Sequence, residues 1–87
     1  MINVNVNMMG IFQEHFSKCL SIKVPKDTTI IILREILIYK FFNKSLDGFS
    51  YLVKNSVFSD NCNILNDKHV LSDNDTVYLL PPFSGGW

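Results

Sequence analysis

The beginning of the chain alternates strictly between apolar residues and asparagine over residues 2–7, which read INVNVN. Alternate side chains of a β-strand point to opposite faces, so this pattern predicts a strand with one buried face and one polar face. Residues 20–24 alternate again and are closed by Pro25, which cannot donate to a sheet ladder. We therefore expect a hairpin of these two strands, connected through residues 13–19, with residues 8–12 extending the first strand around a bend at Gly10.

The segment 29–42 is too long for an ordinary strand and is expected to form the main helix. Residues 25–28 supply helix-start chemistry, in which Asp27 or Thr28 accepts a bond from a free backbone N–H. The stripe on the core-facing side consists of Ile30, Leu33 and Leu37, flanked by Ile36 and Phe41. The remaining apolar residues of the segment are interpreted as extra core packing, with a partner-facing patch as the alternative; they are Ile31, Ile32, Ile38 and Phe42.

The second half of the sequence is interpreted as short elements. Residues 43–49 form a loop, 51–53 a short strand and 54–56 a turn, whereas 57–58 and 64–65 are short apolar pieces around a polar loop. Residues 71–75 form a turn that precedes a final strand over 76–80. The order of elements predicts an α+β fold in which one main helix packs on one face of a mixed sheet. The expected core comprises Val4, Val6, Ile22, Leu33, Leu37, Val77 and Leu79.

Composition and charge exclude several classes of function. The 87 residues suit a single domain, and eight basic residues balance eight acidic ones, so we expect neither nucleic acid nor an anionic membrane surface as a partner. The most apolar stretch is interrupted by charges, and no basic leader precedes the first strand, so we expect neither a membrane span nor a secretory signal. Cys19 and Cys62 form neither a CxxC nor a zinc pattern, and His15 and His69 are isolated; a cytoplasmic protein without a metal site is expected.

The end of the sequence carries the most specific signal. Residues 71–75 read LSDND, residues 77–80 are an apolar strand, and residues 81–87 read PPFSGGW. This arrangement resembles the ThiS/MoaD family of ubiquitin-like sulfur-carrier proteins, in which a Leu-x-Asp-Gly-Asp turn precedes an apolar strand and a Pro-Pro-x-x-Gly-Gly end. Asn74 stands where the family has glycine, and both residues enter the left-handed region. The resemblance implies a β-grasp (ubiquitin-like) domain over residues 1–82 and a flexible tail over residues 83–87.

The resemblance also implies what the tail does. The carboxylate of Gly86, preceded by Gly85, would be adenylated by a ubiquitin-activating-type enzyme and then converted to a thiocarboxylate. The sulfur would pass to a sulfur-transfer or acceptor enzyme that builds a cofactor or metabolite. ATP would be used by the activating enzyme, so the chain is expected to bind no cofactor and to be a protein co-substrate rather than an enzyme.

Three further residues near the end of the chain are candidates for binding a partner enzyme. Phe83 is aromatic within an otherwise small and mobile run, so it either packs on its own domain or anchors the tail in an apolar pocket of a partner. Pro82 and Ser84 flank it. Pro81 and Pro82 end the sheet and favour an extended exit of the chain.

Trp87 departs from the family pattern, in which the active form ends at the second glycine. We interpret it as a processing residue that a JAMM-type metalloprotease removes; an inactive lineage and a residue introduced by cloning are the alternatives. The functional alternatives are the small subunit of molybdopterin synthase, a ubiquitin-like modifier conjugated through Gly86, and a β-grasp binding module without tail chemistry.

Overall fold

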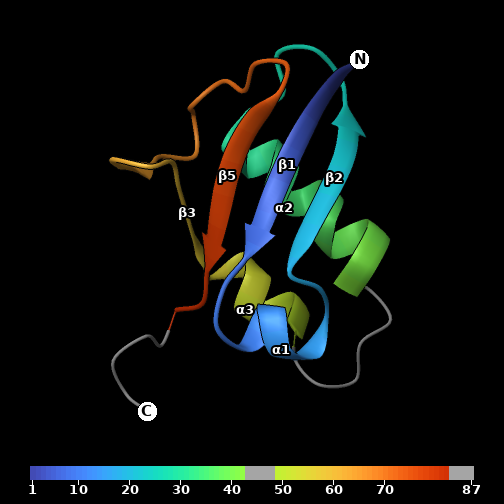
Figure 1. The fold of residues 1–87 in the computed structure, drawn as a ribbon. Coiled ribbons are helices and arrows are strands. Elements are labelled where there is room, and N and C mark those ends of the chain that lie inside the picture. The colour runs from blue at the N-terminus through green and yellow to red at the C-terminus, as the bar shows by residue number, and fades with distance from the viewer. Residues whose placement is uncertain (43–48, 83–87) are drawn as a thin grey trace.

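The computed structural model describes residues 1–42 and 49–82 of the chain (Figure 1). A five-stranded mixed sheet has the strand order β2-β1-β5-β3-β4. In chain order the elements are β1 (Ile2–Met8), α1 (Ile11–His15), β2 (Cys19–Val24), α2 (Ile30–Leu37), a π-helix (Ile38–Phe42), α3 (Phe49–Lys54), β3 (Val57–Ser59), β4 (Ile64–Leu65) and β5 (Asp75–Leu80). The predicted α+β class, a mixed sheet with a main helix on one face, is confirmed.

The strands β1 and β5 form the middle of the sheet and run parallel to each other. β1 pairs antiparallel with β2, with Val4 opposite Ile22, so the predicted hairpin is confirmed. Its other edge pairs with β5, with Met8 opposite Leu79, and β5 in turn pairs antiparallel with β3. β5 is therefore held on both sides, and the position at which it ends is well defined.

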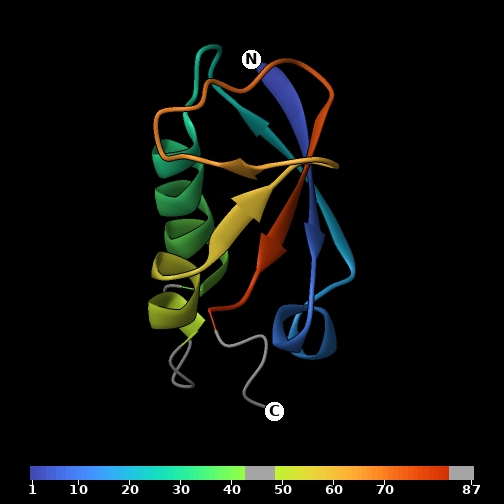
Figure 2. The ribbon, with the colours of Figure 1, turned by 90° about the vertical axis from the view of Figure 1, so that its left-hand side faces the viewer.

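The core lies between the sheet and the helices α2 and α3, which cover the same face (Figure 2). The inward residues of the strands alternate with outward polar ones, as the INVNVN pattern predicts. All seven predicted core residues are buried, and Met8, Phe12, Val24, Ile30, Val53, Phe58 and Leu71 join them. Within the described parts of the chain, no helix is both long and apolar enough to cross a membrane.

Two predictions about short segments were wrong. The segment 51–53, predicted as a strand, lies within the helix α3, which buries Val53 and leaves Tyr51 exposed. Residues 8–12 bend at Gly10 as expected, but the chain then forms the short helix α1 instead of further strand. Periodicity cannot separate helix from strand in apolar runs this short, and packing decides the outcome.

The start of α2 also differs from the prediction. Neither Asp27 nor Thr28 caps the helix: Asp27 adopts a φ of 66° in a turn, and the Thr28 hydroxyl donates to the carbonyl of Pro25 at 2.6 Å. The free N–H groups of Ile30 and Ile31 instead donate to the backbone carbonyls of His69 and Asp67, at 3.0 and 3.1 Å. Backbone carbonyls of the connection between β4 and β5 thus cap the start of α2 in place of a side chain.

The surplus apolar residues of the helical segment divide into two groups. Ile38 packs against the core, as predicted, whereas Ile31 and Ile32 are 41% and 42% exposed. Of the two residues expected to flank the stripe, Ile36 packs against the core and Phe41 is 37% exposed. The side chain of Phe42 lies outside the described part of the chain. Extra core packing therefore accounts for only some of this group.

Candidate functional site

The turn that leads into β5 is fixed by its own side chains and by β1. Asn74 adopts a φ of 67°, which confirms that it occupies a glycine-like position. Asp73 Oδ1 accepts the N–H of Asn3 at 2.8 Å, and the Asn74 N–H donates to the carbonyl of Asn3 at 2.7 Å. Asp75 Oδ2 accepts the N–H of Ser72 at 2.8 Å. The start of β5 is therefore tied to the start of β1.

The end of β5 is where the predicted tail leaves the domain. Leu79 is buried in the core, Pro81 is also buried, and Pro82 is half-buried. Neither proline has an N–H, so the ladder cannot continue past Leu80. The described part of the chain therefore ends, at Pro82, beside one end of the sheet. Phe83, Ser84, Gly85, Gly86 and Trp87 lie outside the described residues, and their predicted roles stay predictions.

Gly10 is a residue of this region that sequence reasoning treated only as a bend. It has a φ of 57°, and a Cβ atom placed on it would lie 3.1 Å from Cγ of Pro81. The turn after β1 and the first proline after β5 are thus in close contact. The sequence signal was a glycine between two apolar segments, which marks a bend but does not identify what packs against it.

The outer face of the sheet borders the point where the tail leaves. It carries mostly polar side chains: the outward positions of β1 are Asn3, Asn5 and Asn7, and Lys23 of β2 lies opposite Asn3 and adds a positive charge. Ser21 Oγ donates to Asn5 Oδ1 at 2.7 Å, and the Tyr78 hydroxyl donates to Asn61 Oδ1 at 3.0 Å. Val57 and Leu80 lie opposite each other in neighbouring strands and are half-buried, so they add apolar surface at the tail end of this face.

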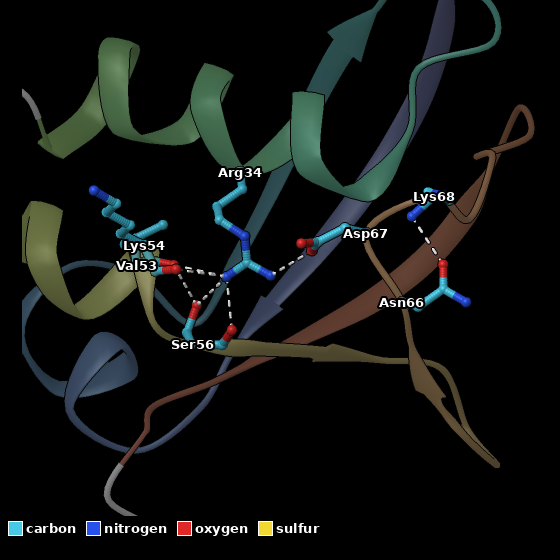
Figure 3. A network of polar contacts seen from close by, with 7 residues as sticks. All are labelled: Arg34, Val53, Lys54, Ser56, Asn66, Asp67 and Lys68. Atoms are coloured by element: carbon cyan, nitrogen blue, oxygen red, sulfur yellow. Dashed lines mark hydrogen bonds and ion pairs between the residues drawn. The ribbon is translucent and has the colours of Figure 1, made fainter.

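A second polar cluster is centred on Arg34 of α2, which bonds to groups of the protein itself and borders a cavity of about 320 Å³ (Figure 3). The Arg34 side chain is 12% exposed, and its Nη1 donates to the carbonyls of Ser56 and Val53 at 2.6 and 2.9 Å. Its Nη2 contacts Asp67 Oδ1 at 3.2 Å. The guanidinium also lies 5.2 Å from the ring centroid of Phe58. These contacts join α2, the end of α3 and the β4–β5 connection, so the cluster holds the fold together.

Among the residues that the structure describes, no three His, Cys, Asp or Glu side chains lie close enough to hold a metal ion. Cys19 and Cys62 are free, exposed thiols. The N–H groups of Cys62 and Asn63 donate to Asp60 and lower the pKa of its exposed carboxyl from its ordinary value. Asp60 thereby shapes the β3–β4 loop.

The fold is that of ubiquitin-like β-grasp proteins. A putative molybdopterin converting factor subunit 1 from Pyrococcus furiosus superposes with a TM-score of 0.74 and 16% identity, over 95% of this chain and 100% of its own. SAMP1 from Haloferax volcanii gives a TM-score of 0.71 and 17% identity, over 97% of this chain and 99% of its own. In a complex of subunits 1 and 2 of molybdopterin-converting factor from Helicobacter pylori, the matching chain superposes with a TM-score of 0.62 and 28% identity, over 98% of this chain and 100% of its own.

These similarities lie in structure rather than in sequence. Neither a protein-family model nor a curated protein sequence matches this chain at a significant level. The fold is shown by the superpositions, and any function has to be argued from the residues of the tail and of its exit.

Proposed function

We propose that this protein is a sulfur carrier whose Gly86 carboxylate is adenylated and converted to a thiocarboxylate. The proposal rests on a ubiquitin-like domain whose last strand, β5, is paired on both sides, with β1 and with β3. This strand is followed directly by the sequence PPFSGG. Molybdopterin converting factor subunits with the same fold, from Pyrococcus furiosus and Helicobacter pylori, support it. Residues 1–82 would be the domain and residues 83–87 the tail.

The chemistry requires the carboxylate to become a good electrophile. A carboxylate oxygen of Gly86 attacks the α-phosphate of ATP in the partner's site, and pyrophosphate leaves. Hydrosulfide (HS⁻) then attacks the carbonyl carbon of the acyl-adenylate, the bond to the AMP oxygen breaks, AMP leaves, and loss of the sulfur-bound proton gives the thiocarboxylate. Gly85 and Gly86 have no Cβ, so this end of the chain can pass through a narrow channel to the nucleotide. ATP belongs to the activating enzyme, and this chain acts as its co-substrate.

The activating enzyme would bind the outer face of the sheet next to the tail. That face is polar, carries the charge of Lys23, and gains apolar surface from Val57 and Leu80 where the tail leaves. Phe83 would add an aromatic anchor immediately beyond, with Pro82 and Ser84 on either side of it. A sulfur-transfer or acceptor enzyme would approach the same end of the domain.

Trp87 would have to be removed before activation. One extra residue displaces the carboxylate by up to about 3.5 Å and puts an indole where the channel accepts no side chain. A metalloprotease of the JAMM type would supply the Gly86 carboxylate by cleaving the bond between Gly86 and Trp87.

The test compares a chain that ends at Gly86 with the full-length chain in ATP–pyrophosphate exchange with an adenylating enzyme of the ubiquitin-activating type. Only the trimmed chain should support exchange. A trimmed chain in which Gly86 is replaced by valine is the matched control, and it should fold normally but stay inactive. Equal adenylation of the full-length chain would contradict the role of Trp87. Inactivity of the trimmed chain with every such enzyme would contradict the proposed function.

The second candidate is a ubiquitin-like modifier. The superpositions with SAMP1 and with a structure described as small archaeal modifier protein 1, both from Haloferax volcanii, favour this candidate. Both candidates begin with adenylation of Gly86 and differ in the acceptor. Intact mass separates them: a thiocarboxylate replaces one oxygen by sulfur, whereas conjugation gives heavier adducts that survive thiols and denaturant.

A further inference from the structure

The turn between β1 and α1 is built around Gly10. Its φ of 57° and ψ of −130° lie in a region that glycine enters freely and that strains other residues. The Phe12 N–H donates to the carbonyl of Met9 at 3.2 Å, and the Glu14 N–H donates to the carbonyl of Gly10 at 3.2 Å. The turn therefore reverses the chain directly after β1 and starts α1.

This turn is bonded to the last residues of β5. Met8 lies opposite Leu79 in the parallel ladder, and the Met9 N–H donates to the carbonyl of Leu79 at 3.2 Å. Both views of the ribbon place α1 at the end of the molecule where β5 finishes (Figures 1 and 2). The end of β5 is therefore in contact with the turn that follows β1, directly before the residues of the tail begin.

The first proline packs on the bare Cα of the glycine. Pro81 is buried, and a Cβ atom on Gly10 would lie 3.1 Å from its Cγ and 3.5 Å from its Cδ. A separation of 3.1 Å is tighter than carbon atoms adopt at their optimum, about 3.5–4.0 Å. Glycine is accordingly favoured here by its backbone angles, and a Cβ at this position would push the Pro81 ring aside by a few tenths of an ångström.

We infer that Gly10 is a positioning residue that sets the direction in which the tail leaves the domain, by seating the Pro81 ring. The inference rests on the proposed function of Gly86. Proline fixes its own φ and restricts the residue before it, so Leu80, Pro81 and Pro82 transmit the position of the ring to the chain beyond. The reacting carboxylate of Gly86 lies five residues past Pro81, and a misplacement of about 1 Å can lower a rate about 100-fold.

The direction of the tail can be measured without any partner. Trp87 is the single tryptophan of the chain, and Cys19 and Cys62 are exposed thiols on β2 and on the β3–β4 loop. An acceptor dye on either thiol, with the other cysteine changed to serine, reports energy transfer from Trp87 to two separate points of the domain. Gly10→Ala should change both transfer efficiencies, and Pro81→Ala, which removes Cγ and Cδ, should change them as well.

A second experiment measures pyrophosphate exchange with the chain trimmed to Gly86 and an adenylating enzyme that accepts it. Because the outer face of the sheet is left intact, Gly10→Ala should lower kcat of pyrophosphate exchange about tenfold or more while the KM for the carrier changes little. Leu33→Val, which loosens the buried side of α2 far from the tail, is the control for lost stability. It should keep both the transfer efficiencies and the kcat of the wild type.

Unchanged transfer efficiencies in Gly10→Ala and Pro81→Ala would overturn the inference, as would an equal fall of kcat in Leu33→Val. If Gly10→Ala is too unstable to measure in buffer, the transfer efficiencies of this variant and of the wild type are compared in a stabilising osmolyte, because Pro81→Ala also frees the φ of residue 81 and cannot decide alone. If no enzyme adenylates the trimmed wild-type chain, the proposed function fails, and the transfer measurement still decides whether Gly10 directs the tail.

Discussion

Replacing Arg34 by methionine should destabilise the domain severely, and the structure indicates which contact carries most of the loss. Nη1 has two hydrogens, and its short bonds go to the carbonyls of Ser56 at 2.6 Å and Val53 at 2.9 Å. Val53 O also accepts bonds from the N–H of Ser56 at 3.2 Å and from its hydroxyl at 2.7 Å. Removing the guanidinium therefore costs the most at the carbonyl of Ser56, because the carbonyl of Val53 keeps its bonds from Ser56.

The magnitude follows from three contributions. A hydrogen bond to a charged group contributes about 1.5–3 kcal/mol to stability. The guanidinium 5.2 Å from the Phe58 ring centroid adds about 0.5–1 kcal/mol. The pair with Asp67 adds at most about 1 kcal/mol, because the Asp67 side chain is 52% exposed and its charge is screened by water. Methionine retains the apolar stem, so we expect Arg34→Met to lower the free energy of unfolding by about 3 kcal/mol.

Urea unfolding followed by far-ultraviolet circular dichroism measures this loss. For a domain of this size, about 3 kcal/mol corresponds to a fall in Tm of about 12–24 °C. Asp67→Asn is the matched control and should cost no more than about 1 kcal/mol, because it removes only the exposed ion pair. A loss below about 1 kcal/mol for Arg34→Met would refute the reasoning, since it would mean that water replaces the guanidinium at the Ser56 carbonyl.

Three other changes test separate parts of the structure. Leu37→Ala should lower the free energy of unfolding by about 2–5 kcal/mol, because the side chain is fully buried; a loss near zero in urea unfolding would contradict the packing of α2. Asn74→Gly should be nearly neutral in the same assay, whereas Asn74→Val should cost about 1–2 kcal/mol, because a β-branched residue is strained at a φ of 67°; equal stabilities would contradict this reading of the turn. Phe83→Ala should weaken complex formation with the activating enzyme, measured by calorimetry, more than it lowers Tm; a fall in Tm alone would assign Phe83 to the core of its own domain.

The parts of the fold that the sequence predicted correctly are those with a long or regular pattern. The alternation over residues 2–7 identified β1 and its buried face, and the stripe Ile30, Leu33 and Leu37 identified the inner side of α2. The LSDND turn required a residue that tolerates positive φ, and Asn74 supplies it. Each of these signals is local, because it depends only on neighbouring residues.

The features that were missed depend on residues far apart in the sequence. Residues 51–53 are of types common in strands, yet they are helical because Val53 is buried and because Arg34, from another helix, bonds the carbonyls at the end of α3. The N–H groups at the start of α2 find backbone carbonyls, which carry no sequence signal. The contact of Gly10 with Pro81 joins residues that only the parallel pairing of β1 with β5 brings together.

The contacts that stabilise the fold and those that direct the tail involve different residues. Asp67 makes two contacts with α2: its carbonyl accepts the Ile31 N–H, and its carboxylate contacts Arg34. A change at Arg34 should therefore disturb the start of α2 and the β4–β5 connection. The seat of Pro81 depends instead on Gly10 and on the end of β1. Because the Arg34 contacts include neither Gly10 nor Pro81, Arg34→Met should lower stability and leave the contact between those two residues in place in the molecules that remain folded. Gly10→Ala should redirect the tail in a domain whose helical layer is intact.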